Sequence, residues 1–209
     1  PCVVTADARL DFAARRIVWG KFMNAGQTCI CPDYMIVDKK IRDRFLELLR
    51  KEISSSDGTD PEKSEDYARI INSSNVRRLE SLMHSGVIVT GGKCDPEGCY
   101  VEPTVIKDIR PGDPVMDEEI FGPLLPVIDY EDFQEVYGII EQHPKPLAVY
   151  IFTRNRKVAG EFIARTQSGT AAVNDTVIQI ASPYLPYGGV GSAGWENTMV
   201  KSHLRLSQT

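Results

Sequence analysis

The sequence of 209 residues has no long hydrophobic run and no cluster of basic residues. Its uncharged apolar stretches are far shorter than the roughly 20 residues that a membrane helix needs. Lysine and arginine number 24 against 29 acidic residues, giving a formal net charge of −5, which argues against a nucleic-acid partner. No basic segment followed by an apolar run stands at the start, so we expect no signal peptide and no membrane segment.

Histidine and cysteine are also scarce. The five cysteines (Cys2, Cys29, Cys31, Cys94 and Cys99) include no C-x-x-C pair, and a secreted disulfide scaffold would carry more of them in a shorter chain. The spacings C-x-C and C-x4-C differ from those of zinc sites, and the three histidines are scattered. We therefore expect reduced thiols in a cytoplasmic protein without a metal site.

What the chain does contain is a repeated alternation of strand-like and helix-like segments, with 42% hydrophobic residues to build a core. Helical periodicity predicts helices over residues 7–23, 38–49, 73–84, 131–142 and 155–167, the first two capped by Asp7 and Asp38. Short apolar runs predict strands at residues 2–4, 35–37, 87–90, 104–106, 125–128, 147–152 and 169–173. The alternation indicates an α/β fold with a mostly parallel sheet flanked by helices, and an irregular tail from Ser182.

The most informative segment is Phe22-Met23-Asn24-Ala25-Gly26-Gln27-Thr28-Cys29. A helix of apolar periodicity ends there in a polar turn that presents Cys29 ahead of the next strand. Such a turn leaves backbone N–H groups that can bind a developing oxyanion. A nucleophilic cysteine needs a lowered pKa or a nearby base, and no histidine stands close in sequence. A buried thiol at a helix end is the alternative interpretation.

This chain resembles the aldehyde dehydrogenase superfamily at several points in the correct order. Phe-x-Asn-x-Gly-Gln-x-Cys, ending at Cys29, is the active-site signature of that family. Glu119-Ile120-Phe121-Gly122-Pro123 is similar to its second signature, and Pro186-Tyr187-Gly188-Gly189-Val190-Gly191 follows near the end. The segments from Trp19 to Tyr34 and at Val173-Asn174-Asp175 most resemble the class 3, fatty-aldehyde branch.

The resemblance implies covalent catalysis with a nicotinamide cofactor, NAD or NADP. In the family, the cysteine that matches Cys29 attacks the aldehyde to form a thiohemiacetal, and a thioester is then hydrolysed to the acid. Glu119 matches the glutamate that binds the nicotinamide ribose, and Phe121 matches the aromatic residue packed beside it. By resemblance to class 3 members, Val177, Ile180, Ala181 and Tyr187 would line the substrate entrance. The alternative is that Ile178 and Ile180 are core residues of a short strand.

Complete family members also contain an N-terminal cofactor-binding domain and a general-base glutamate, which this sequence lacks. We therefore expect residues 1–209 to form the catalytic domain, inactive alone, of a parent chain that is a homodimer. A second hypothesis is a non-catalytic remnant that serves as a structural or oligomerisation module. A thiol redox or metal protein that uses Cys29 and Cys31 would need a C-x-x-C pair or further ligands.

Overall fold

A computed structural model describes residues 1–56, 61–64, 66–181 and 188–190. Its main feature is a seven-stranded sheet in the order β3-β6-β7-β2-β1-β8-β9, beside a small β4–β5 hairpin. Within the seven-stranded sheet of the described residues, only β3 runs antiparallel to its neighbour, which confirms the expected mostly parallel sheet. The strands are β1 (Cys2–Val4), β2 (Met35–Asp38), β3 (Val87–Thr90), β4 (Cys94–Asp95), β5 (Tyr100–Val101), β6 (Thr104–Lys107), β7 (Leu124–Tyr130), β8 (Ala148–Phe152) and β9 (Thr170–Val173).

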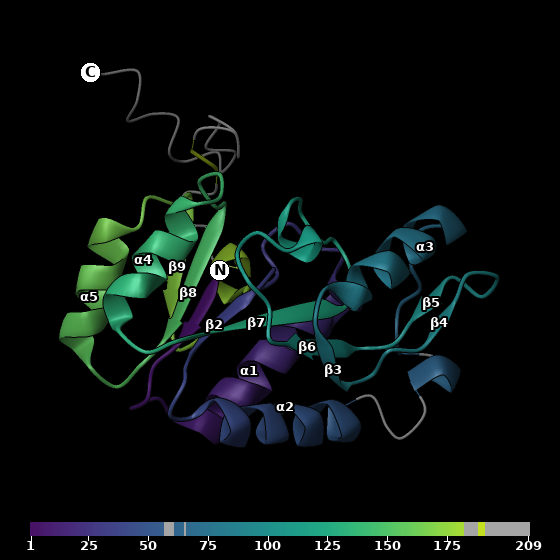
Figure 1. The fold of residues 1–209 in the computed structure, drawn as a ribbon, viewed down its shortest axis with the longest axis horizontal. Coiled ribbons are helices and arrows are strands. Elements are labelled where there is room, and N and C mark those ends of the chain that lie inside the picture. The colour runs from purple at the N-terminus through teal and green to yellow at the C-terminus, as the bar shows by residue number, and fades with distance from the viewer. Residues whose placement is uncertain (57–60, 65, 182–187, 191–209) are drawn as a thin grey trace.

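Helices cover both faces of the sheet (Figure 1). One face is covered by α1 (Leu10–Phe22) and α2 (Arg42–Ser56), which pack against each other. The residues of α3 (Ser73–Leu82), α4 (Phe133–Glu141) and α5 (Arg156–Arg165) belong to the core of the other face. Short 3₁₀ helices lie at Met23–Gly26, Pro61–Lys63, Met83–Ser85, Pro114–Met116 and Ile178–Ala181.

The strands divide their side chains between two hydrophobic cores. In β8, Tyr150 and Phe152 belong to the core under α1 and α2, whereas Val149 and Ile151 belong to the core under α3, α4 and α5. Alternate side chains of a strand point to opposite faces, so a strand that is buried on both must be apolar throughout. The uninterrupted apolar run at residues 147–152 therefore predicted this strand correctly.

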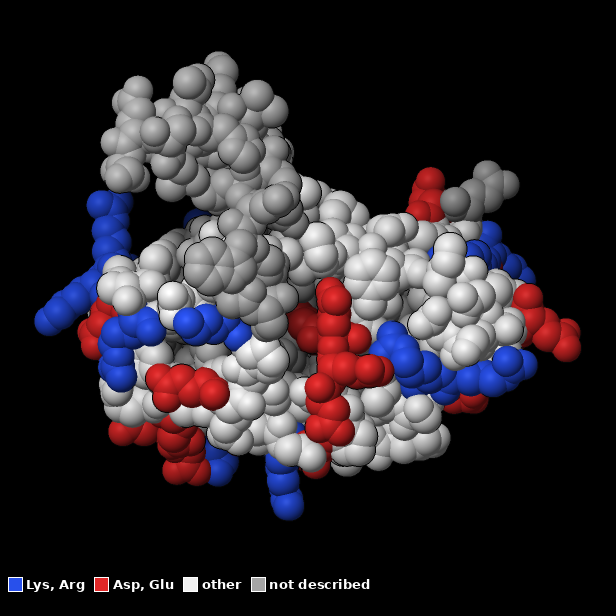
Figure 2. All heavy atoms as spheres, turned by 90° about the horizontal axis from the view of Figure 1, so that it is seen from above, with Lys and Arg blue, Asp and Glu red and all other residues white. Residues whose placement is uncertain are grey.

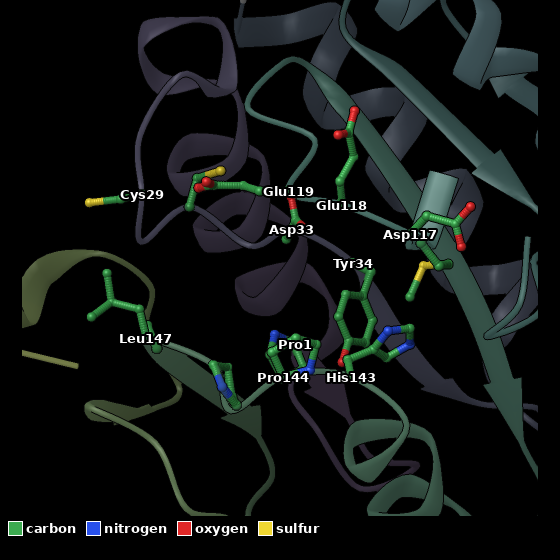
Figure 3. A pocket seen from close by; sticks show the side chains of 14 residues that line it. Pro1, Cys29, Asp33, Tyr34, Asp117, Glu118, Glu119, His143, Pro144 and Leu147 are labelled. Carbon is green, nitrogen blue, oxygen red and sulfur yellow. The ribbon is translucent and has the colours of Figure 1, made fainter. Parts of the chain in front are cut away.

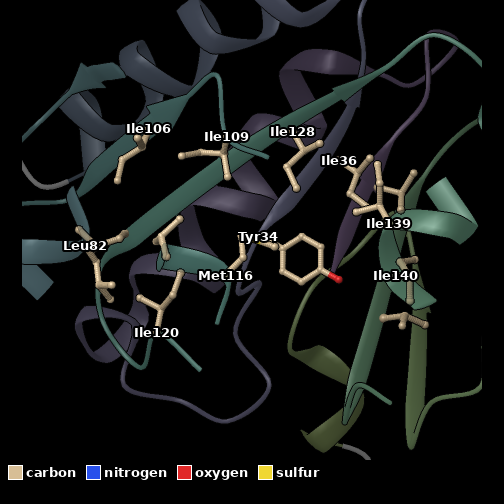
Figure 4. Packing of buried hydrophobic residues seen from close by; sticks show 14 of the residues in the cluster. Tyr34, Ile36, Leu82, Ile106, Ile109, Met116, Ile120, Ile128, Ile139 and Ile140 are labelled. Atoms are coloured by element: carbon tan, nitrogen blue, oxygen red, sulfur yellow. The ribbon is translucent and has the colours of Figure 1, made fainter. Parts of the chain in front are cut away.

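The core on the α3–α5 face extends across the sheet and under the loops that precede its strands (Figure 4). It contains Ile36, Ile106 and Ile128 from the strands, and it reaches Tyr34 and Ile120 at the end of the sheet. Ile120 is fully buried. This packing anchors the loop that bears Glu119 to the body of the domain.

The two predicted helix caps are wrong. α1 begins after Arg9, whose side chain makes no capping bond. Asp7 instead accepts hydrogen bonds from Thr153 Oγ1 at 2.8 Å and from the backbone N–H of Arg154 at 3.1 Å. Asp38 is the last residue of β2, and α2 begins only at Arg42. Most of the predicted tail, from Ser182 on, lies outside the described residues.

Candidate functional site

A cavity of about 510 Å³ opens at the end of the sheet where β1, β2, β7 and β8 begin. Its walls come from the segments that precede these strands, including Cys29, Asp33, Glu119 and His143 (Figure 3). Ligand sites of open parallel sheets usually lie at the opposite, carboxyl ends of the strands. Because β2 and β7 are neighbours in the sheet, the segments that precede them bring the motifs at Cys29 and Glu119 together, although these motifs lie far apart in the sequence.

The turn that carries Cys29 is closed by its own side chains. Asn24 Nδ2 donates to the carbonyl of Gln27 at 3.0 Å, and Gln27 Nε2 donates back to the carbonyl of Asn24 at 3.2 Å. The Gln27 amide also joins the turn to another segment, because its Nε2 donates to the carbonyl of Arg69 and its Oε1 accepts from the N–H of Ile71. Asn24 has the positive φ of 53° that asparagine tolerates better than most residues. The turn is thus a fixed structure.

The thiol of Cys29 is exposed at the rim of the cavity. In Figure 3 its sulfur points away from the carboxylates of Asp33 and Glu119. Accessibility is a requirement for a thiol that must meet a substrate. This exposure excludes the alternative interpretation of Cys29 as a buried thiol at a helix end.

The loop that carries Glu119 touches the Cys29 turn through two glycines. A Cβ on Gly26 would lie 2.2 Å from the carbonyl oxygen of Gly122, and Gly26 itself has a φ of +71°. Only glycine satisfies both conditions without strain. The glycines of the two sequence motifs therefore allow the two backbones to meet.

Glu119 lines the cavity, and among the described residues none donates a hydrogen bond to its carboxylate. Burial, reinforced by the charge of Asp33, raises the pKa of Glu119, and Lys21 and Arg78 oppose this shift. Acidic side chains gather near the middle of the face shown in Figure 2. Neighbouring Glu118 is also exposed, but it pairs with Arg78 at 3.1 Å, as expected for a solvated residue.

Phe121 follows Glu119 on the same loop, with 43% of its surface exposed. It is one of the few large hydrophobic side chains left in solvent, and its φ is +45°. A carboxylate without a donor and an exposed aromatic ring two residues away fit a ligand that offers hydroxyl groups beside a flat ring. This donor and ring chemistry fits the ribose and nicotinamide that the sequence resemblance predicts there.

Cys31 has a different environment from Cys29, although the two are separated by one residue. Its thiol is buried, donates to the carbonyl of Gly26 at 3.3 Å, and lies 3.9 Å from the ammonium of Lys21. Burial raises the pKa of this thiol. Cys2 is also fully buried, and burial raises its pKa to about 12. Both thiols are therefore inert compared with an exposed one.

The predicted substrate entrance falls on the segment of residues 177–181, here called the entrance segment. Ile180 and Ala181 are exposed on its 3₁₀ helix, whereas Val177 is buried among the residues that pack against α1. Ile178 is half exposed, so the alternative of a core strand is wrong. Tyr187 lies outside the described residues.

Sequence reasoning missed several residues that hold this site. Asp33 Oδ1 accepts from the backbone N–H of Ile120 at 3.2 Å, and Arg78 Nη2 donates to the carbonyl of the same residue at 2.5 Å. Lys21 is fully buried beside the turn. A lysine on the apolar stripe of a helix was a signal for the last of these, because a lysine is rarely buried unless its charge is paired.

Within the described part of the chain, no group of three or more acidic, cysteine or histidine side chains is arranged to hold a metal ion. Over the same residues, no helix has the length and apolarity needed to span a membrane. None of the five cysteines, all of which lie in the described residues, forms a disulfide bond.

Comparison with known proteins identifies one family. A model of the aldehyde dehydrogenase family matches residues 1–207. The dimeric NADP-preferring aldehyde dehydrogenase of Rattus norvegicus is 44% identical over 194 residues, which are 93% of this chain and 43% of that protein. Aldehyde dehydrogenase family 3 comG of Dictyostelium discoideum is 41% identical over 93% of this chain. The chain thus spans less than half the length of these two relatives.

Solved structures give the same result. The substrate-bound AldH of Staphylococcus aureus superposes with a TM-score of 0.92 and 38% identity, covering 95% of this chain and 44% of that one. The glyceraldehyde-3-phosphate dehydrogenase GapN of Methanocaldococcus jannaschii, in complex with NADP, has a TM-score of 0.86 at 25% identity, covering 96% of this chain and 44% of that one. The fold around the cavity is therefore shared with these dehydrogenases.

Proposed function

The chain belongs to the aldehyde dehydrogenase family, and we propose that it supplies the nucleophile of an enzyme that oxidises aldehydes to carboxylic acids. The observation that carries this proposal is the placement of the exposed Cys29 thiol, on a fixed turn, at the rim of the cavity that Glu119 also lines. This chain spans 43% of the rat relative, and we propose that the whole protein supplies the rest of the active site from segments beyond residues 1–209.

In this proposal the thiolate of Cys29 attacks the carbonyl carbon of the aldehyde, and a C–S bond forms as the carbonyl oxygen becomes an oxyanion. The backbone N–H of Cys29 is the proposed donor to that oxyanion. Once the carbon has been oxidised, the acyl group remains on Cys29 as a thioester. Water then cleaves the C–S bond, which releases the acid and returns the thiol. The turn bonds of Asn24 and Gln27 keep the sulfur in place throughout.

The cofactor in this proposal is NAD or NADP, which supplies the hydride acceptor when it is bound. Glu119 would accept hydrogen bonds from the hydroxyls of its nicotinamide ribose, and Phe121 would pack beside the ribose and ring. Support comes from the unpaired state of the Glu119 carboxylate among the described residues and from the exposure of Phe121. The rat relative is described as NADP-preferring and dimeric. We propose a homodimer in the cytoplasm, where free thiols persist.

For the substrate, we propose an aldehyde with an apolar tail. The entrance segment carries no charge, and Ile180 and Ala181 are exposed on it. Burying each additional methylene contributes about 0.8 kcal/mol, or about fourfold in specificity. With straight-chain aldehydes of three to ten carbons, kcat/KM of the whole protein should rise several-fold per carbon and then level off. If kcat/KM did not change with chain length, Ile180 and Ala181 would not line the substrate entrance.

The decisive experiment replaces the nucleophile. In the whole protein that carries this chain, Cys29→Ser should lower aldehyde oxidation by about a thousandfold or more, because a hydroxyl without an activating base is a far weaker nucleophile. Cys31→Ser is the matched control, since this buried thiol lies two residues away and should retain activity. A Cys29→Ser protein with near-normal turnover would disprove the covalent mechanism. A wild-type protein without activity would favour the structural-module hypothesis.

A further inference from the structure

Tyr150 and Gln179 are buried polar residues to which the proposed chemistry gives no role. Tyr150, in the middle of β8, donates its hydroxyl proton to the carbonyl of Ile30 at 2.5 Å. Gln179, in the entrance segment, places its Nε2 2.9 Å from the same hydroxyl. Ile30 directly follows Cys29. Two consecutive hydrogen bonds thus join the entrance segment to the peptide unit between Ile30 and Cys31, one unit beyond the one that follows Cys29.

The chemistry of the three groups fixes the direction of both bonds. A carbonyl oxygen can only accept, so the single hydroxyl proton of Tyr150 must go to Ile30. With its proton on Ile30, the hydroxyl can only accept from Gln179, so the Gln179 amide presents its nitrogen; the Val177 backbone also contributes a hydrogen bond to the phenol. Burial raises the pKa of Tyr150, so the phenol keeps its proton at neutral pH. The remaining Gln179 oxygen, Oε1, is buried and accepts no hydrogen bond from the described residues.

The same part of the chain is also fastened to the helix that leads to Cys29. Thr176 Oγ1 donates to the carbonyl of Arg16 at 2.6 Å, and the Arg16 guanidinium pairs with Asp175 at 2.6 Å. A Cβ on Gly20 would lie 2.2 Å from Thr176 Oγ1, so the segment lies directly against α1. Residues 175–179 therefore hold the nucleophile turn from two sides, through α1 and through Ile30.

We propose that Tyr150 and Gln179 are positioning residues that orient the Cys29 turn. By fixing the Ile30 carbonyl, they restrict rotation of the Ile30–Cys31 peptide and so limit movement of the backbone that carries the Cys29 thiol. The catalytic meaning of this relay rests on the proposed function, whereas its effect on the turn can be measured without any activity.

The test is hydrogen–deuterium exchange of the whole protein, followed by mass spectrometry of the peptide that spans residues 27–34. Tyr150→Phe removes both hydrogen bonds of the relay and Gln179→Met removes one, and each variant should increase local exchange of this peptide about fivefold or more. The double variant should exchange no faster than Tyr150→Phe alone, since both residues act in one chain. Tyr130→Phe is the control, because it removes the hydroxyl of another buried tyrosine, on β7.

A Gln179→Glu variant tests the direction of the relay. An ionised glutamate at this position can only accept, so the Tyr150 hydroxyl would donate to it and no longer to the Ile30 carbonyl. Exchange should then increase more than in Gln179→Met. Protonated, the glutamate can donate as glutamine does. Relative to wild type at each pH, protection of residues 27–34 should therefore return as the pH falls. If the protein oxidises aldehydes, kcat per titratable Cys29 should follow the same pattern while the cofactor KM stays unchanged.

Three results would overturn this inference: exchange of residues 27–34 no faster than in Tyr130→Phe, a uniform loss of protection in all peptides, or no effect of pH on Gln179→Glu. The first two would mean that the relay contributes nothing or only general stability. Failure of the proposed function is a separate result. An active Cys29→Ser protein would contradict the covalent mechanism but would not change the exchange rates that test the relay.

Discussion

The two loops that meet at the cavity are held by different forces. The Cys29 turn is closed by neutral groups, namely the amides of Asn24 and Gln27 and the hydroxyl of Tyr150. The Glu119 loop is held by charged groups, since Arg78 and Asp33 bind the two backbone groups of Ile120. Hydrogen bonds to charged groups are stronger than neutral ones, and this loop also carries Glu119, whose pKa is raised by burial, whereas the amides of the Cys29 turn do not titrate. We therefore expect pH to affect cofactor binding more than the position of the nucleophile.

The largest effect should come from the point where the loops touch. Gly26→Ala would add a Cβ 2.2 Å from the Gly122 carbonyl at a positive φ. The free energy of unfolding should fall by about 2–4 kcal/mol, measured by urea denaturation. Gly138→Ala is the matched control, because it lies in α4 with open space around its Cβ and should stabilise the protein by about 0.5–1 kcal/mol. Equal stability of Gly26→Ala and wild type would contradict the close approach.

A smaller effect should separate the two loops functionally. Arg78→Met removes the donor to the Ile120 carbonyl and the ion pair with Glu118. Loss of a charge-assisted hydrogen bond should weaken binding of NADP to the whole protein about tenfold, measured by fluorescence titration. Alkylation of Cys29 by iodoacetamide should keep its wild-type rate.

The control for Arg78 is Glu118→Gln, which removes only the exposed ion pair. Such pairs contribute little, so NADP binding should change less than twofold. If this variant weakens binding as much as Arg78→Met does, the ion pair rather than the Ile120 bond holds the loop. A slower alkylation of Cys29 in Arg78→Met would show that the two loops are not held separately.

The sequence could predict features that depend on local patterns, but not contacts between residues far apart in the chain. The strands were predictable because burial on both faces requires continuous apolar runs, such as residues 147–152. Cys29 and Glu119 were predicted from their resemblance to family motifs, and the glycines of those motifs, Gly26 and Gly122, lie where the two backbones meet. Asp7 was assigned wrongly as a helix cap, since its partners Thr153 and Arg154 lie more than 140 residues away. Strand order alone brings such partners together, and it is equally what brings Arg78 to Ile120 and Tyr150 to Ile30.

The smallest effect concerns the charge of Asp33. Asp33→Asn keeps an oxygen that can accept from the N–H of Ile120 but removes the negative charge near Glu119. The pKa of Glu119 is raised first by burial and then by Asp33, so the variant should lower it. A protonated Glu119 accepts fewer hydrogen bonds from a ribose, so wild-type NADP affinity should weaken as the pH falls through this raised pKa.

In Asp33→Asn that weakening should begin at a lower pH, which would leave NADP binding about twofold to threefold tighter than in wild type on the acidic side and equal at pH 8. Dissociation constants for NADP between pH 5 and 8 measure this difference. Asp33→Ala is the control: it also loses the acceptor for Ile120 and should weaken binding at every pH. Identical profiles for Asp33→Asn and wild type would mean that burial alone sets the ionisation of Glu119, and that the charges around this loop serve only to hold its backbone.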